Sequence, residues 1–167
     1  GIWQTQSGSF MIKALIMDVD GTLSDGKIYI GTSGEMMKSF NVKDGFGIVH
    51  LLPGKHIIPV IITGRSSEIV KNRAAELHIS LLYQGVSDKI AYMKSILQEQ
   101  GIKLFETAYI GDDLNDYDCM RIIRDNGGLI GAPCDACRKV VELADFVSEH
   151  KGGDGAVREF IEWLLCQ

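Results

Sequence analysis

The segment Ala14–Thr22, with the sequence ALIMDVDGT, decides the fold of this 167-residue chain. Four consecutive apolar residues, Ala14–Met17, predict a strand buried on both faces, as in the centre of a parallel sheet. Two carboxylates, Asp18 and Asp20, follow where the strand opens into a turn at Gly21. Ligands of open α/β sheets bind at the carboxyl ends of the strands, so the segment predicts an α/β fold with a polar site at that edge.

Strand-like and helix-like segments alternate along the rest of the chain. Apolar, β-branched runs predict strands at Lys13–Asp18, Ile57–Ile62, Leu81–Tyr83, Thr107–Ile110, Gly128–Gly131 and Phe146–Val147. Helical spacing of apolar residues predicts helices at Ser67–Leu77, Asp88–Gln100, Asn115–Ile123, Asp135–Leu143 and Gly155–Leu165. This alternation indicates a Rossmann-like, three-layer fold, with a parallel sheet between two helical layers.

One segment interrupts the alternation. Two short strand-like runs, Lys27–Ile30 and Met36–Phe40, flank the glycine-containing loop Gly31–Glu35 and predict a β-hairpin at about 27–40. It follows the first acidic cluster directly, so we expect a flap over or beside the polar edge. Its Ile, Tyr and Phe side chains favour pairing with another subunit.

Composition excludes several classes of function. The net charge of −5 argues against a nucleic-acid partner, because phosphate backbones require a basic surface. No apolar run approaches the roughly 20 residues that span a bilayer. Met11 can serve as a native start, so residues 1–10 are interpreted as a tag remnant or disordered lead. We expect one domain over residues 11–167, without an inserted cap domain.

The cysteine pattern is compatible with a cytoplasmic protein that keeps its thiols reduced. Cys134 and Cys137 have the C-x-x-C spacing of half a zinc site or of a redox pair. No second Cys or His pair stands at ligand spacing, so we favour two small residues at the start of a helix.

A second acidic cluster, Gly111–Asp113, follows the apolar run Thr107–Ile110. Because parallel strands end at the same edge, both clusters can surround one hard divalent cation, which prefers oxygen ligands. The combination is typical of phosphoryl transfer through an aspartate, with Asp18 as the nucleophile. Asp20 would protonate the leaving oxygen and then activate water. An Asp-Gly pair alone would indicate only a turn.

Further polar residues fit the same chemistry. Thr63 ends the second core strand and can donate a hydrogen bond to a phosphoryl oxygen, and Gly64 and Arg65 follow it. Lys89 stands at a helix start, where a cation gains nothing from the helix dipole, so a role in phosphate binding is favoured over a solvated lysine.

The acidic loop continues beyond the second cluster. Asp112 is expected as a direct metal ligand, and Asp113 as a ligand through water or as the helix N-cap. Asp116 is expected to position Lys89.

In order and spacing, Asp18-x-Asp20, Thr63, Lys89 and Gly111–Asp113 resemble the four motifs of haloacid dehalogenase superfamily phosphatases. The resemblance covers the chain from about Ile12 to its end. It implies Asp18 as nucleophile and Asp20 as general acid/base. It also implies Mg²⁺ held by Asp18, the Asp20 main-chain carbonyl and Asp112.

The hairpin and the segments Phe40–Ile48, Tyr83–Lys89 and Gly152–Glu159 resemble the capless subfamily that includes the 3-deoxy-D-manno-octulosonate 8-phosphate phosphatases. The resemblance implies a homotetramer assembled through the hairpins and a phosphorylated sugar acid as substrate. It places Asp44, Gly45, Gly64 and Arg65 among the substrate-binding residues, with Arg65 holding the sugar carboxylate. An ordinary surface ion pair is the alternative for Arg65.

Two features leave the sugar open. The acidic residue Asp154 resembles the residue type found in phosphatases of nine-carbon nonulosonate 9-phosphates. Arg65 indicates the opposite, because those enzymes can have an acidic residue after Thr-Gly. A non-catalytic assembly domain of this fold is a second alternative, although Asp18, Asp20, Lys89 and Asp112 are all present. A receiver domain is disfavoured by the hairpin, and a phosphomutase by the lack of a lid.

Overall fold

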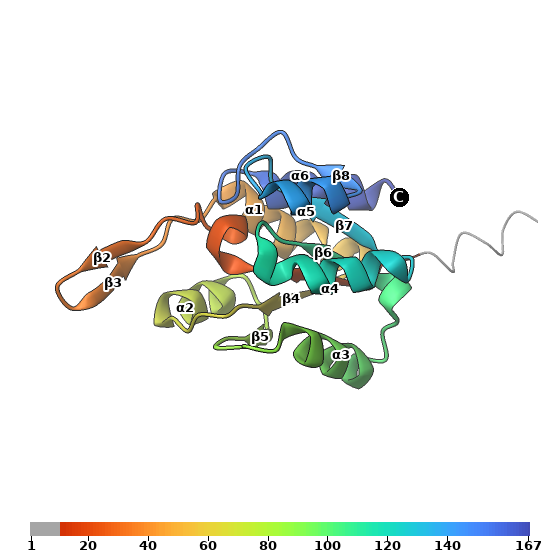
Figure 1. The fold of residues 1–167 in the computed structure, drawn as a ribbon, viewed down its shortest axis with the longest axis horizontal. Helices are drawn as coiled ribbons and strands as arrows, with labels where there is room; N and C mark the ends of the chain where they lie inside the picture. The colour runs from red at the N-terminus through yellow and green to blue at the C-terminus, as the bar shows by residue number, and fades with distance from the viewer. Residues whose placement is uncertain (1–10) are drawn as a thin grey trace, which may run out of the picture.

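A six-stranded parallel sheet with β1 near its middle organises the protein (Figure 1). The computed structural model describes residues 11–167, so the expectation for residues 1–10 lies outside the described residues. The strand order is β5-β4-β1-β6-β7-β8. The strands are β1 (Ala14–Met17), β4 (Ile58–Ile62), β5 (Leu81–Tyr83), β6 (Thr107–Ile110), β7 (Leu129–Ala132) and β8 (Phe146–Val147). The predicted α/β, Rossmann-like fold is confirmed.

Both faces of the sheet are covered by helices, as the apolar run of β1 predicts. Leu15 and Met17 pack into one core with α2 (Glu68–Glu76) and α6 (Ala156–Leu165). Ala14 and Ile16 belong to the other core. That second core contains α3 (Lys89–Gln100), α4 (Leu114–Asp125) and α5 (Arg138–Leu143). All four side chains of β1 are fully buried, as expected for a strand that is covered on both faces.

The hairpin projects from the body of the protein, as Figure 1 shows. Its strands, β2 (Tyr29–Gly31) and β3 (Gly34–Met37), are shorter than predicted and pair only with each other. The five-residue loop expected between them contracts to a turn, because Gly34 adopts a φ of 110°. The side chain of Ile30 is 71% exposed and that of Met36 is 70% exposed, so the described chain leaves the hairpin uncovered.

A helical segment that the sequence analysis does not predict follows the hairpin. It comprises α1 (Val42–Phe46) and two further turns, Gly47–Leu51 and Pro53–Lys55. Glycine is a poor helix former, so Gly45 and Gly47 conceal the pattern. A Cβ at Gly45 would lie 2.6 Å from a terminal guanidinium nitrogen of Arg73, so a larger residue there would require the Arg73 side chain to move.

Elsewhere the boundaries shift by a few residues. The predicted helix at Asp135–Leu143 begins at Arg138, after Cys137 as its N-cap residue, and Cys134 is exposed. Between residues 11 and 167, no helix combines the length and the apolar character that crossing a membrane requires.

Candidate active site

The carboxyl ends of β1, β4 and β6 form one polar pocket. Met17 is in register with Ile61 on one side and Ile110 on the other, so the residues that follow these strands lie at the same edge. In the sheet, β4 lies on one side of β1 and β6 lies on the other, so the strand order reverses direction at β1. Ligands of open α/β sheets bind at such a reversal. The pocket has a volume of about 320 Å³ and is lined by Asp18, Asp20, Gly26, Thr63, Gly64, Arg65, Asp112, Asp113 and Asn115.

Three carboxylates converge beneath this pocket. Asp18, Asp112 and Asp116 each offer an oxygen, and these oxygens lie within 4.8 Å of one another. Burial, and then the charge of Asp116, raise the pKa of Asp18 to about 7. Burial, and then the charge of Asp18, likewise raise the pKa of Asp112 to about 7. Carboxylates that repel one another in this way are suited to a divalent cation, which prefers oxygen donors.

Asp116 gives a further sign of fit to a cation. Its side chain is fully buried, and its Oδ2 atom has no hydrogen-bond partner within residues 11–167. The other oxygen, Oδ1, accepts a hydrogen bond from the Tyr109 hydroxyl at 2.6 Å. Asp18 and Asp112 line the pocket and offer the oxygen donors that Mg²⁺ prefers, and the unpartnered oxygen of Asp116 adds negative charge beside them.

Lys89 reaches into the acidic cluster from the first turn of α3. Its Nζ lies 2.9 Å from Asp116 Oδ1 and 3.3 Å from Asp18 Oδ1. Burial alone would lower the pKa of Lys89, but the two carboxylates outweigh burial and raise it. The expected contact between Asp116 and Lys89 is present. Tyr109 cannot be recognised from sequence as part of the site, because an aromatic residue inside an apolar strand is indistinguishable from a core residue.

The turn after β1 is fitted closely around Asp112. Gly21 has a φ of 87°, and a Cβ at this position would overlap the Asp112 carboxylate. The hydroxyl of Thr22 donates a hydrogen bond to Asp112 Oδ1 at 3.2 Å. The two acidic clusters therefore depend on each other for their positions, and the sequence Asp-Gly-Thr is required by this packing.

A lysine outside the predicted set contacts Asp20. Lys38 follows β3 of the hairpin, and its Nζ lies 2.7 Å from Asp20 Oδ1. A second acid, Glu35, lies 2.7 Å from the same nitrogen. Sequence spacing gives no signal for this contact, since it depends on how the base of the hairpin is placed relative to the turn after β1.

The residues expected at the end of β4 line the pocket. Thr63 is buried, whereas Gly64 and Arg65 are exposed at its rim. Arg65 makes none of the salt bridges found within residues 11–167, although its charge contributes to lowering the pKa of Glu35. Asp113 is the N-cap of α4, where Oδ1 accepts a hydrogen bond from the Leu114 amide at 2.8 Å.

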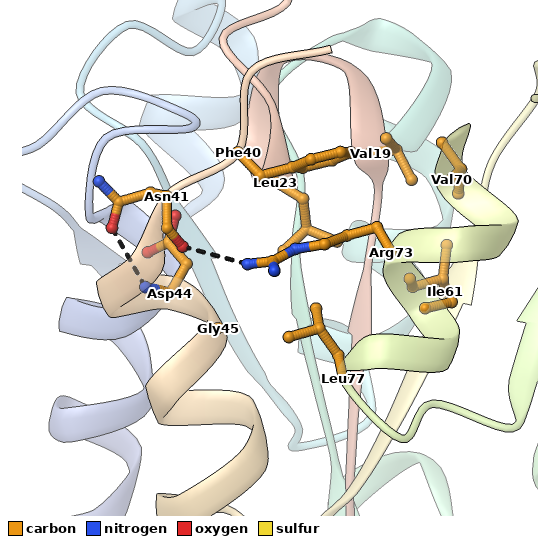
Figure 2. Close-up of a pocket in the computed structure, with 11 residues that line it drawn as sticks. Val19, Leu23, Phe40, Asn41, Asp44, Gly45, Ile61, Val70, Arg73 and Leu77 are labelled. Carbon is orange, nitrogen blue, oxygen red and sulfur yellow. Dashed lines mark hydrogen bonds between the residues drawn. The ribbon is translucent and has the colours of Figure 1, made fainter. Parts of the chain in front are cut away.

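Asp44 and Gly45 lie elsewhere in a single chain. Both line a small cavity of about 10 Å³ between α1 and α2 (Figure 2). Asp44 is 2% exposed, and its Oδ1 accepts a hydrogen bond from the Arg158 amide at the start of α6. The described chain does not bring these two residues to the pocket, and their contacts join helices to one another.

The chain is similar to phosphatases of known sequence and structure. The KdsC 3-deoxy-D-manno-octulosonate 8-phosphate phosphatase of Escherichia coli K12 is 45% identical over 154 residues, covering 92% of this chain and 79% of the relative. A crystal structure of the corresponding phosphatase from Moraxella catarrhalis, in complex with magnesium, phosphate and KDO, has a TM-score of 0.86. It is 40% identical and covers 96% of this chain and 89% of that chain.

A third relative gives the broader group. A structure described as a HAD superfamily (subfamily III A) hydrolase from Legionella pneumophila has a TM-score of 0.85 and 39% identity, covering 96% of this chain and 85% of that chain. No protein-family profile matches the chain.

Proposed function

We propose that this chain, which belongs to the 3-deoxy-D-manno-octulosonate 8-phosphate phosphatase family of the haloacid dehalogenase superfamily, hydrolyses that sugar phosphate with Mg²⁺ as cofactor. The enzyme is a phosphoric monoester hydrolase. The observation that carries the proposal is the largely buried cluster of Asp18, Asp112 and Asp116 at the carboxyl edge of the sheet, with Lys89 in contact. A merely structural cluster of this charge would be costly to bury.

Asp18 and Asp20 divide the chemistry. An oxygen of the Asp18 carboxylate attacks phosphorus, the bond to the sugar oxygen breaks, and Asp20 gives its proton to that oxygen. The resulting carboxylate of Asp20 then takes a proton from water. The water oxygen attacks phosphorus, the acyl phosphate bond breaks, and inorganic phosphate and the Asp18 carboxylate are released.

The remaining charges lower the barrier to this transfer. Bound Mg²⁺ would supply neutralisation of the phosphoryl oxygens, and its ligands would be Asp18, the Asp20 main-chain carbonyl and Asp112. Lys89 compensates negative charge at Asp18 and is itself held by Asp116. Asp113, at the rim, would act through a bound water.

Substrate recognition is assigned to the end of β4. The Thr63 hydroxyl donates to a phosphoryl oxygen, and the main chain at Gly64 allows a ligand to approach closely. Arg65, exposed at the rim, is suited to bidentate binding of the sugar carboxylate. Asp154, the residue similar to the nonulosonate enzymes, does not line this pocket in one chain. The eight-carbon substrate is therefore preferred.

We propose that four copies of this chain form a homotetramer through their hairpins. We also propose that the protein is cytoplasmic. The exposed apolar side chains at Ile28, Ile30, Met36 and Met37 support the homotetramer, since isolated hairpins with uncovered apolar residues favour pairing with another chain. Light scattering coupled to size-exclusion chromatography gives the mass directly. A monomer would contradict the proposed assembly without affecting the chemistry.

The test of function is phosphate release with and without Mg²⁺. The panel contains octulosonate 8-phosphate, the nonulosonate 9-phosphates and simple hexose phosphates. We expect strong, Mg²⁺-dependent preference for octulosonate 8-phosphate. Preference for a 9-phosphate would assign the other sugar, and absence of activity on the whole panel in folded protein would reject the proposal.

A further inference from the structure

The base of the hairpin carries a buried cation that the proposed chemistry does not yet use. The side chain of Lys38 is only 4% exposed, although it belongs to a segment that projects from the body. Its Nζ contacts Asp20 Oδ1 and Glu35 Oε1, both at 2.7 Å. Within residues 11–167, no other side chain donates a hydrogen bond to the Asp20 carboxylate.

The contacts of Lys38 continue into the body of the protein. Glu35 accepts a hydrogen bond from the Ser67 hydroxyl at 2.7 Å. Ser67 is the N-cap of α2, and its hydroxyl oxygen accepts from the Ile69 amide at 3.2 Å. The chain Asp20–Lys38–Glu35–Ser67 therefore connects the turn after β1 with the N-terminus of the helix that follows β4. We refer to these four residues as the Lys38 bridge.

The charges of the Lys38 bridge keep the lysine cationic. Burial alone would lower the pKa of Lys38, but hydrogen bonds to Asp20 and then Glu35 raise it. Hydrogen bonding to Lys38 outweighs burial and lowers the pKa of Glu35. A lysine ammonium has three donors, and two of them are engaged here.

We propose that Lys38, anchored by Glu35 and Ser67, is a positioning residue that holds the Asp20 carboxylate in the orientation required for proton transfer to the leaving oxygen. The proposal rests on the proposed acid/base role of Asp20. The contact of Lys38 with Oδ1 fixes the direction of the Asp20 carboxylate. Asp20 lines the pocket and its side chain is 30% exposed, so without Lys38 it could rotate into solvent.

A direct role in substrate binding is the alternative for Lys38. The lysine is nearly inaccessible and does not line the pocket, which favours action through Asp20. The two roles predict different kinetics. A binding cation affects all phosphates alike, whereas misplacing a general acid affects those whose leaving oxygen needs the proton.

The experiment compares phenyl phosphate, which has a poor leaving group, with 4-nitrophenyl phosphate, which has a good one. For Lys38→Met we expect kcat to fall about 10–100-fold with phenyl phosphate, part of what general acid catalysis supplies, and less than about 3-fold with 4-nitrophenyl phosphate. Glu35→Gln, which weakens the anchor and preserves the hydrogen bond from Ser67, should give a smaller loss of the same pattern. Lys27→Met is the matched control, because Lys27 is exposed beside the same hairpin.

A double-mutant cycle completes the test. If Lys38 acts through Asp20, adding Lys38→Met to Asp20→Asn should change the residual rate by less than about 2-fold. Equal losses on both substrates, or a full additional loss in the Asp20→Asn background, would overturn the positioning role. If Asp20→Asn itself leaves the leaving-group dependence unchanged, the proposed function of Asp20 fails instead. Circular dichroism of each variant excludes loss of fold as the cause.

Discussion

Replacing Asp44 by Asn should change how the stability of this protein depends on pH. Asp44 is buried, lies across from Arg73 of α2 (Figure 2), and does not line the pocket that contains the acidic cluster. Burial raises its pKa from 3.8 to about 6, and the charge of Asp154 acts in the same direction. The Arg158 and Gly155 amides and the charge of Arg73 oppose this rise without overcoming it. Asn keeps the size of the side chain and an acceptor for the Arg158 amide.

The sign and size follow from the two pKa values. Because the folded-state value is raised, the folded state binds the Asp44 proton more tightly, and the group stabilises the fold below its unfolded pKa. This stabilisation is lost as pH rises through about 6. For one such group it amounts to about 1.4 kcal/mol at pH 5 and about 0.1 kcal/mol at pH 7. The Asn variant lacks it at both pH values.

The assay is urea unfolding of both proteins at pH 5 and pH 7, at fixed ionic strength and protein concentration. The free energy of unfolding of Asp44→Asn, relative to the parent, should rise by about 1.3 kcal/mol between pH 5 and pH 7. Comparing the two proteins at each pH cancels the titration of all other groups. Asp118→Asn, at an exposed aspartate, is the control and should give a constant difference.

A difference that stays constant between pH 5 and pH 7 would refute the reasoning. It would mean that the Asp44 carboxylate is solvated or paired well enough to ionise normally despite being 2% exposed. A difference of the opposite sign would mean that the charged form is favoured, and would assign Arg73 as its dominant partner.

Further predictions concern the pocket and the hairpin. Asp18→Asn should abolish phosphate release while circular dichroism stays unchanged; retained turnover would exclude it as nucleophile. Gly21→Ala should lower the free energy of unfolding by about 1–3 kcal/mol and weaken Mg²⁺ activation, because its φ of 87° and the Asp112 carboxylate both exclude a Cβ; unchanged melting and Mg²⁺ titration would contradict this. Arg65→Ala should reduce kcat/KM more for octulosonate 8-phosphate than for 4-nitrophenyl phosphate, and equal losses would remove its carboxylate role. Ile30→Lys should reduce the assembly mass in light scattering, and an unchanged mass would exclude the hairpin from the interface.

The edge of the sheet could be predicted from sequence because each of its parts is local. Apolar runs identify β1, β4 and β6, and the polar residue after each run must lie at the carboxyl edge once the strands are parallel. Asp18, Thr63 and Asp112 therefore needed no knowledge of tertiary contacts. Tyr109 could not be predicted because, in sequence, it looks like one more core residue of β6. Only the structure shows that its hydroxyl donates a hydrogen bond to Asp116.

Asp44 and Gly45 illustrate the opposite case. Their segment forms α1, which glycine conceals, and the direction in which each residue points depends on that helix. Once the helix is formed, Gly45 packs against Arg73 and Asp44 reaches the start of α6. An aspartate in a glycine-containing segment, such as Asp44, is therefore weak evidence for substrate binding when the local structure is unknown.

Lys38 could not be predicted because its contact with Asp20 requires the hairpin to lean in one direction. A two-stranded hairpin is marginally stable by itself in water. Here β2 and β3 pair only with each other, so contacts such as Glu35 with Ser67 must fix the hairpin on the body. Covering Ile30 and Met36 in an assembly would stabilise the same arrangement, and through Lys38 it would stabilise the position of the acid. The proposed assembly and the proposed proton transfer therefore share one structural element, which gives a physical reason for a projecting, apolar hairpin beside a phosphatase pocket.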